Sequence, residues 1–189
     1  MSTIVDHQIW KLAQTHQLIS EFNPEQLNPA SYDVRLGGEI LVEGIAVGPK
    51  DMRERWRKVS IEEEPYYMSP NEFVLGFTVE YIRIPSNMEA VFQLKSSRGR
   101  EGYEHALAGY IDPGFQGQVT LELSNLNQRH TIPLIKDMLI GQLRFMKVDA
   151  VPSRTYADTG HYQGDLGVQP SKTGLIFPVE DMIFECEEK

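Results

Sequence analysis

The sequence lacks the residues that several common kinds of site and segment require. Cys186 is the single cysteine among 189 residues, which excludes an internal disulfide and a metal site built on paired cysteines. The longest apolar runs, such as residues 73–75 and 138–140, are much shorter than the roughly 20 residues that cross a bilayer. These short runs predict no membrane partner. Residues 1–6 contain no basic segment followed by an apolar one, which predicts no secretion signal and a cytoplasmic location.

Motifs for metals and nucleotide cofactors are also missing. A zinc-dependent nucleobase deaminase combines a His or Cys two residues before a catalytic Glu with a Cys-x-x-Cys pair, and the sequence does not have this combination. It has neither a P-loop nor the dinucleotide-binding glycine pattern. The histidines show no metal-ligand spacing and are expected to be surface or packed residues. They are His7, His16, His105, His130 and His161.

Positive charge is scarce as well. Lys and Arg number 18 against 27 Asp and Glu, which gives a formal net charge of −9. Binding to nucleic acid depends on many Lys and Arg contacts to phosphate, so a nucleic-acid partner is not expected. A small polyphosphate needs only a local positive pocket, and residues 95–100 supply several basic side chains within a short segment.

The remaining composition is that of an ordinary folded domain. Hydrophobic residues make up 41% and charged residues 24% of the chain, which favours neither a disordered nor a fibrous protein. A chain of 189 residues can bury a substantial core as one domain and is short for two. We therefore expect a single domain, in which residues 1–152 form the core and residues 153–189 form a C-terminal segment and tail.

Apolar periodicity predicts one helix followed by β-structure. Val5, Ile9 and Leu12 have helical spacing, and Asp6 is the expected N-cap. Residues 48–70 are charged and contain prolines, which predicts a long loop or hairpin. Short strands between Gly and Pro turns indicate a compact, mainly β barrel or sandwich rather than alternating strands and helices. Strands are predicted at residues 32–36, 73–81, 88–94, 119–124 and 139–148.

Residues 95–100 have the composition of a phosphate-binding segment. Backbone N–H groups near a glycine, together with hydroxyl and guanidinium donors, can direct several charge-assisted hydrogen bonds at one phosphate. A solvated basic turn would have the same composition, so both interpretations stay open. The residues are Lys95, Ser96, Ser97, Arg98, Gly99 and Arg100.

Two carboxylates, Asp112 and Glu122, lie on either side of a turn-forming segment at residues 113–117. If the apolar residues of the following strand face the core, Glu122 shares the opposite face with two hydroxyl side chains, Thr120 and Ser124. A carboxylate among hydroxyls can orient a water molecule and act as a general base. The alternative is that this face is simply exposed to solvent.

Several segments closely resemble the motifs of the dCTP deaminase family, within the dCTP deaminase and dUTPase superfamily. The central ones are residues 95–100 (KSSRGR), 105–117 (HALAGYIDPGFQG) and 120–125 (TLELSN). Their order and spacing match the family apart from one residue fewer between Arg100 and Ala108. Further segments that resemble an early motif, a late motif and the C-terminal lid of the family are residues 29–37 (PASYDVRLG), 138–143 (MLIGQL), Tyr156 and 162–164 (YQG).

The resemblance implies a fold, an assembly and a reaction. The fold would be a distorted β-barrel or jelly roll of the dUTPase type with a short N-terminal helix, assembled as a homotrimer with active sites between subunits. The reaction would be deamination of dCTP at cytosine C4 to dUTP and ammonia, without zinc. Glu122 would act as general base and acid. Ser96 and the backbone around Ala108 would hold the attacking water, and Arg100 would support the developing charge.

The resemblance also implies contacts to the substrate. Ser97 and its neighbours would bind phosphate, and Asp112 would lie near the deoxyribose 3′-hydroxyl. Gln142 and Tyr156 would contact the base or the phosphates, and Mg²⁺ would be bound through the triphosphate. The full set of implied substrate-binding residues is Lys95, Ser97, Arg98, Gly99, Asp112, Thr120, Leu121, Gln142, Tyr156, His161 and Gln163.

Departures from the family pattern fall mainly in the lid. Leu107 stands where the family commonly has Thr, His161 where the lid commonly has a phosphate-binding Lys, and Asp165 where Gln is common. Replacing a cation and an amide by His and Asp should weaken triphosphate binding unless Lys172 or Arg154 compensates.

Four functions remain open from the sequence. The first is deamination of dCTP to dUTP. The second is a bifunctional enzyme that also releases pyrophosphate and forms dUMP, because residues 108–112 (AGYID) resemble those variants as well as dUTPases. A dUTPase without deamination is less favoured, because plain dUTPases generally lack a Glu at the position of Glu122. The fourth is a non-catalytic module that binds deoxynucleotides and has lost turnover through the lid changes.

Overall fold

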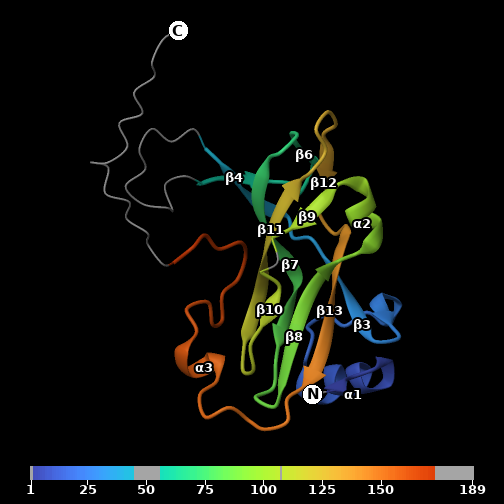
Figure 1. The fold of residues 1–189 in the computed structure, drawn as a ribbon, viewed down its shortest axis with the longest axis vertical. Coiled ribbons are helices and arrows are strands. Elements are labelled where there is room, and N and C mark those ends of the chain that lie inside the picture. The colour runs from blue at the N-terminus through green and yellow to red at the C-terminus, as the bar shows by residue number, and fades with distance from the viewer. Residues whose placement is uncertain (1, 45–55, 107, 173–189) are drawn as a thin grey trace, which may run out of the picture.

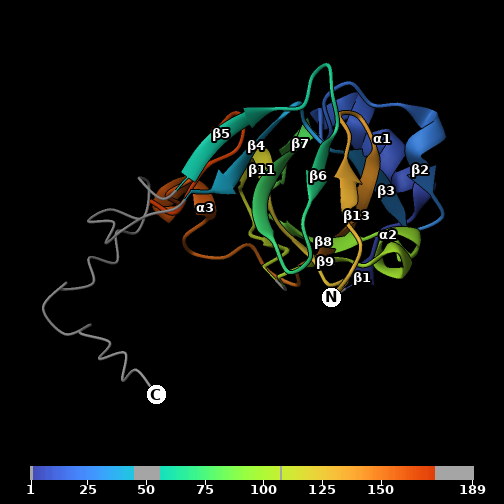
Figure 2. The same ribbon diagram turned by 90° about the horizontal axis from the view of Figure 1, so that it is seen from above.

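The structure is a computed structural model that describes residues 2–44, 56–106 and 108–172. Leu107, Cys186, residues 48–55 of the expected hairpin and the tail after residue 172 lie outside these ranges. No helix in the described part of the chain is long and apolar enough to cross a membrane. The predicted mainly β class is confirmed, and two large antiparallel sheets dominate the ribbon (Figures 1 and 2).

The strands form two large sheets and one small one. The first sheet has the order β10 (Tyr110–Ile111), β8 (Met88–Leu94), β13 (Leu139–Lys147), β3 (Ser31–Arg35) and β2 (Leu27–Asn28), with β1 (Ser2–Thr3) paired to β13. The second has the order β5 (Trp56–Ser60), β4 (Glu39–Glu43), β7 (Phe73–Arg83), β11 (Gln116–Asn125) and β9 (Tyr103–His105). The small sheet pairs β12 (Ile132–Leu134) with β6 (Tyr66–Met68). Neither large sheet closes into a barrel within the described ranges.

The helices are few and short. The predicted N-terminal helix is α1 (Asp6–His16), but its N-cap is Val5 rather than Asp6. The side chain of Gln8 reaches back and accepts a hydrogen bond from the Val5 backbone N–H at 3.0 Å, which satisfies the donor before the first turn. The other helices are the 3₁₀ turn η1 (Pro24–Gln26), α2 (Ser96–Glu101) and α3 (Tyr156–Thr159).

The core lies between the two large sheets, and β11 shows how the sequence places it. Leu121 and Leu123 are fully buried among core residues of both sheets. Thr120 and Glu122 alternate with them and are partly exposed on the opposite face. The predicted alternation is confirmed for residues 120–123, and it turns Glu122 away from the core. Val119, which belongs to the predicted core set, is only half-buried beside a bulge in the pairing with β7.

Strand β7 is buried on one face and half-buried on the other. Its core face carries Val74 together with two polar residues, Thr78 and Glu80, which are fully buried. Phe73 and Leu75, which belong to the apolar set of the predicted alternation, contribute to a second and smaller apolar cluster on the other side of the sheet. Phe73 and Leu75 therefore line a surface cavity and do not belong to the main core.

Buried ion pairs join the sheets near the early motif. Glu80 accepts hydrogen bonds from the Arg35 backbone N–H at 2.9 Å, from Arg35 Nε at 2.8 Å and from Gln26 Nε2 at 3.1 Å. These bonds compensate the cost of burying a carboxylate. Lys95, which precedes α2, forms an ion pair with the buried Asp33 of β3. The pair fixes the start of α2 against the first sheet.

The predicted hairpin excursion after β4 is confirmed in part. Strand β4 pairs with β5 in antiparallel register, from Glu39 opposite Ser60 to Glu43 opposite Trp56. Strand β5 is the edge of its sheet and most of its side chains face solvent. Because residues 56–60 are therefore partly charged, the sequence pattern did not predict this strand.

Candidate active site

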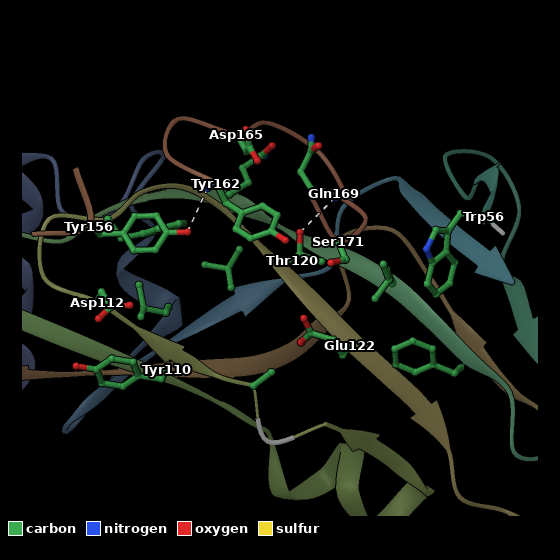
Figure 3. A pocket seen from close by; sticks show the side chains of 17 residues that line it. Trp56, Tyr110, Asp112, Thr120, Glu122, Tyr156, Tyr162, Asp165, Gln169 and Ser171 are labelled. Atoms are coloured by element: carbon green, nitrogen blue, oxygen red, sulfur yellow. Dashed lines mark hydrogen bonds between the residues drawn. The ribbon is translucent and has the colours of Figure 1, made fainter. Parts of the chain in front are cut away.

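A cavity of about 550 Å³ lies on the outer face of β11, opposite the core. It is bounded by β11, by residues 108–112 and by a C-terminal segment that crosses above them, which we call the strap (residues 155–171) (Figure 3). The described side chains that line the cavity are Trp56, Phe73, Leu75, Ala108, Tyr110, Ile111, Asp112, Phe115, Gln118, Val119, Thr120, Glu122, Tyr156, Tyr162, Asp165, Gln169 and Ser171.

The strap is attached to β11 by a ladder of hydrogen bonds. The Gln118 N–H donates to the Asp165 carbonyl at 3.0 Å, and the Gly167 N–H donates to Gln118 Oε1 at 2.6 Å. Further along, the Gln169 N–H donates to Thr120 Oγ1 at 3.3 Å. The strap therefore follows β11 and roofs the cavity (Figure 3).

Gly114 makes the close approach of the strap possible. Its φ of +87° is a left-handed conformation that side chains disfavour. A Cβ at this position would also lie 2.8 Å from Cβ of Thr155. The neighbouring carbonyl of Pro113 accepts a hydrogen bond from the Tyr156 N–H at 2.8 Å. The Pro-Gly turn between the two carboxylates is thus the docking point for the start of the strap.

Glu122 points into the space between β11 and the strap (Figure 3). Its side chain is 28% exposed, and its Oε2 lies 3.1 Å from Nε2 of the buried His105. The His105 ring packs against Phe92, with 4.7 Å between ring centroids. Nothing in the sequence beyond its place in a family motif distinguished His105, because a lone histidine has no diagnostic spacing.

Asp112 stands at the far end of the cavity beside an acidic neighbour. Burial, and secondly the charge of Glu89, raise the pKa of Asp112 above its ordinary value. Tyr110 lies between them and donates a hydrogen bond to Glu89 Oε2 at 2.9 Å. Burial, together with this hydrogen bond and the charge of Glu89, raises the pKa of Tyr110 to about 12. Tyr110 is therefore a neutral donor at physiological pH.

Tyr156 closes the same end of the cavity. Its ring packs edge-on against Phe115, with 5.4 Å between centroids. Burial is the main cause that raises the pKa of Tyr156. Its hydroxyl accepts a hydrogen bond from the Tyr162 N–H at 3.2 Å, which joins the start of the strap to the residues that follow α3.

The structure brings part of the predicted site together. Five of the residues predicted from the resemblance line the cavity, and they come from three separate segments of the chain. They are Ala108, Asp112, Thr120, Glu122 and Tyr156.

In the segment predicted to bind phosphate, residues 96–100 belong to helix α2, and no residue of the segment lines the cavity. Lys95 is paired with Asp33. Arg98 pairs with Glu101 at 2.7 Å and lies 5.7 Å from the centroid of the Tyr103 ring. The exposed members of the segment are Ser96, Ser97, Gly99 and Arg100.

Four other predicted residues lie apart from the cavity surface. Leu121 is fully buried in the core, so only its backbone could contact a ligand. Gln142 accepts a hydrogen bond from Ser31 at 2.8 Å on the first sheet. Gln163 donates to the Gly114 carbonyl at 3.1 Å and thereby holds the strap. His161 lines a neighbouring cavity of about 600 Å³ that shares Asp112 and Tyr156 with the first.

Comparison with known proteins agrees with this architecture. A family model described as dCTP deaminase-like matches residues 3–148. A solved structure of 2′-deoxycytidine 5′-triphosphate deaminase from Agrobacterium tumefaciens superposes with a TM-score of 0.60 at 22% identity, over 76% of this chain. The match covers 47% of that longer chain, and it supports the fold.

Curated relatives match over most of their length. "dCTP deaminase, dUMP-forming" of Dictyoglomus turgidum is 40% identical over 171 residues, which covers 83% of this chain and 86% of the relative. The protein of the same name from Aquifex aeolicus is 39% identical and covers 88% and 92%. That from Bifidobacterium adolescentis is 37% identical and covers 90% and 93%. The chain belongs to the dCTP deaminase-like family.

Proposed function

We propose that this protein is a dCTP deaminase of the dUMP-forming kind, which deaminates the cytosine and also releases pyrophosphate. The observation that carries the proposal is the Glu122 carboxylate, which faces a nucleotide-sized cavity between β11 and the strap. The relatives named above support the dUMP-forming product. They favour this alternative over the expectation that the reaction stops at dUTP.

Glu122 acts as the base in the proposed deamination. It removes a proton from a water molecule, whose oxygen adds to C4 of cytosine. The protonated carboxyl then returns this proton to the pyrimidine ring. The C4–N bond breaks as the amino group takes up the remaining proton of the attacking water and leaves as ammonia. The backbone around Ala108 and the hydroxyl of Thr120 border the same space and can hold the water.

The second proposed step breaks the bond between the α- and β-phosphates, and water supplies the oxygen of the new phosphate group. Products are dUMP and pyrophosphate. Among residues 2–44, 56–106 and 108–172, no three His, Cys, Asp or Glu side chains are grouped to hold a metal ion. In the proposal the phosphates themselves provide ligands for Mg²⁺, which would neutralise part of their charge.

We further propose that the active site is shared between subunits of a homotrimer. The described lining of the cavity includes Asp112, Glu122 and Asp165 but no Lys or Arg. A triphosphate in such a site requires positive charge from elsewhere. Arg100 is exposed on α2 and is available to a neighbouring subunit. The resemblance to trimeric enzymes and this imbalance of charge support the same assembly.

One product assay tests the function. The purified protein is incubated with dCTP and Mg²⁺, and the nucleotides are separated while ammonia and pyrophosphate are measured. We expect dUMP, ammonia and pyrophosphate in equal amounts, and Glu122→Gln should release no ammonia while it still binds dCTP. Accumulation of dUTP would refute the dUMP-forming step. Ammonia release by Glu122→Gln at the wild-type rate would show that Glu122 is not the catalytic base. A parallel incubation with dUTP tests the dUTPase alternative, which would be favoured if dUMP forms from dUTP but not from dCTP.

A further inference from the structure

His105 is held firmly behind the wall of the cavity. It is the last residue of β9, where the chain leaves the second sheet and continues towards β10. The imidazole is 6% exposed and packs at 56° to the ring of Phe92 from β8. Strand pairing places its backbone opposite Leu123 of β11. The ring therefore has little freedom to move away from its neighbours.

The closest polar neighbour of this ring is the carboxylate of Glu122. His105 Nε2 and Glu122 Oε2 lie 3.1 Å apart, and both atoms are buried. Apart from this contact, neither atom has a hydrogen-bond partner among the described residues. A buried polar atom without a partner is costly, so a small rotation that aligns the two as donor and acceptor is favourable.

The charged surroundings favour a hydrogen on Nε2. Glu122 faces the ring from β11, and Glu104 on β9 accepts a hydrogen bond from the His105 backbone N–H at 3.0 Å. From β8 the contact is the uncharged Phe92, and from β10 the titratable neighbour across a small surface groove is Tyr110. No described basic side chain contacts the pair. Both the neutral Nε2–H tautomer and the imidazolium can donate to Glu122.

We propose that His105 is a positioning residue for Glu122. Its Nε2–H donates to Oε2 of the carboxylate, which stabilises the ionised form that must accept a proton from water. The same bond fixes the side chain so that its remaining oxygen is directed at the cavity. This inference rests on the proposed deaminase function, because it assigns His105 a task in that reaction.

Substitution by Phe removes the donor and keeps a ring against Phe92. A charge-assisted hydrogen bond of ordinary strength corresponds to a factor of roughly 10 to 100. We therefore expect His105→Phe to lower kcat for dCTP by roughly 10- to 100-fold at neutral pH, with little change in KM. His105→Gln, which offers an amide donor at similar reach, should recover most of kcat.

Matched measurements separate this role from a structural one. His130→Gln changes an exposed histidine and should behave like the wild type. The imidazole nitrogen resonances of His105, followed by NMR, should shift in Glu122→Gln whether or not the enzyme turns over. An unchanged kcat in His105→Phe would overturn the inference, as would His105 resonances that do not change in Glu122→Gln. Loss of dCTP binding together with kcat would indicate a merely structural role and would also overturn it.

The same assays distinguish failure of the proposed function from failure of the role proposed for His105. A wild-type protein that releases no ammonia from dCTP refutes the function, and with it the task of His105 in that reaction. Wild-type turnover with an indifferent His105→Phe refutes only the role of His105.

Discussion

Gly109→Ala tests how tightly the wall of the cavity is built. Gly109 stands between Ala108 and Tyr110, which both line the cavity. A Cβ added to it would lie 2.4 Å from the carbonyl oxygen and 3.2 Å from the carbonyl carbon of Phe92. The Phe92 N–H also donates to the Gly109 carbonyl at 2.7 Å. Because the obstacle is strand backbone, β8 and the segment 108–111 must separate until the first contact reaches at least 3.0 Å.

Overpacking of this kind costs about 1–3 kcal/mol. At a fixed protein concentration, thermal unfolding should therefore begin roughly 3–10 °C lower than in the wild type. The backbone of Ala108 must move with its neighbour, so we also expect kcat for dCTP to fall about tenfold or more. Ammonia release and circular dichroism measure the two effects separately.

Gly99→Ala is the matched control for stability. Gly99 lies inside α2, and nothing would lie within 4 Å of an added Cβ. Replacing a helical glycine by alanine in open space should stabilise the protein by about 0.5–1 kcal/mol. We therefore expect the free energy of unfolding to fall in Gly109→Ala and to rise in Gly99→Ala. Wild-type unfolding temperature and kcat in Gly109→Ala would refute the steric argument.

Three further predictions concern buried charge, pH and assembly. Glu80→Ala removes a fully buried carboxylate that pairs with the partly buried Arg35 and should lower the free energy of unfolding in urea by about 3 kcal/mol; a loss below about 1 kcal/mol would contradict this. Burial and the charge of Glu89 raise the pKa of Asp112, so KM for dCTP should rise as the pH falls through that pKa. Glu89→Gln should move this rise to lower pH, and an unmoved profile would argue against the coupling. Glu122→Gln and Arg100→Ala, each inactive alone, should regain part of the activity when co-assembled in mixed trimers, whereas persistent inactivity would argue against a shared site.

The sequence predicted which side chains form the core where a strand buries one face and leaves the other more exposed. Strand β11 has a core face and a cavity face, and its alternation predicted both correctly over residues 120–123; Val119, next to a bulge, lines the cavity as well. Strand β7 is buried on one face and half-buried on the other, and both faces carry apolar residues, so its alternation predicted a strand but not which side chains form the core. Strand β5 was missed because an edge strand with a solvated face has a charged sequence. Pairing with β4 stabilises it, and no local propensity reveals such pairing.

The candidate site was predictable where its residues are close in sequence. Asp112, Thr120 and Glu122 come from one turn and strand, and the cavity brings them together. The contact of His105 with Glu122 depends on the pairing of β9 with β11, and the place of Gln169 depends on the path of the strap. Both are tertiary contacts, which spacing along the chain does not specify.

The position of Lys172 shows how the two lid departures, His161 and Asp165, affect the charge of the site. This side chain, proposed as a substitute for a missing lid cation, forms an ion pair with Asp165 and donates to the His161 carbonyl at 3.0 Å. It also lies 5.0 Å from the centroid of the Tyr162 ring. Lys172, directly after the strap, thus pairs with a strap residue and offsets one of the three carboxylates of the cavity lining. The charge needed for a triphosphate must come from another source, because the described lining of this cavity has no basic residue. Arg154 lines the neighbouring cavity that shares Asp112 and Tyr156 with the first. Arg154 and, in the proposed trimer, Arg100 of a second subunit are therefore the two candidates.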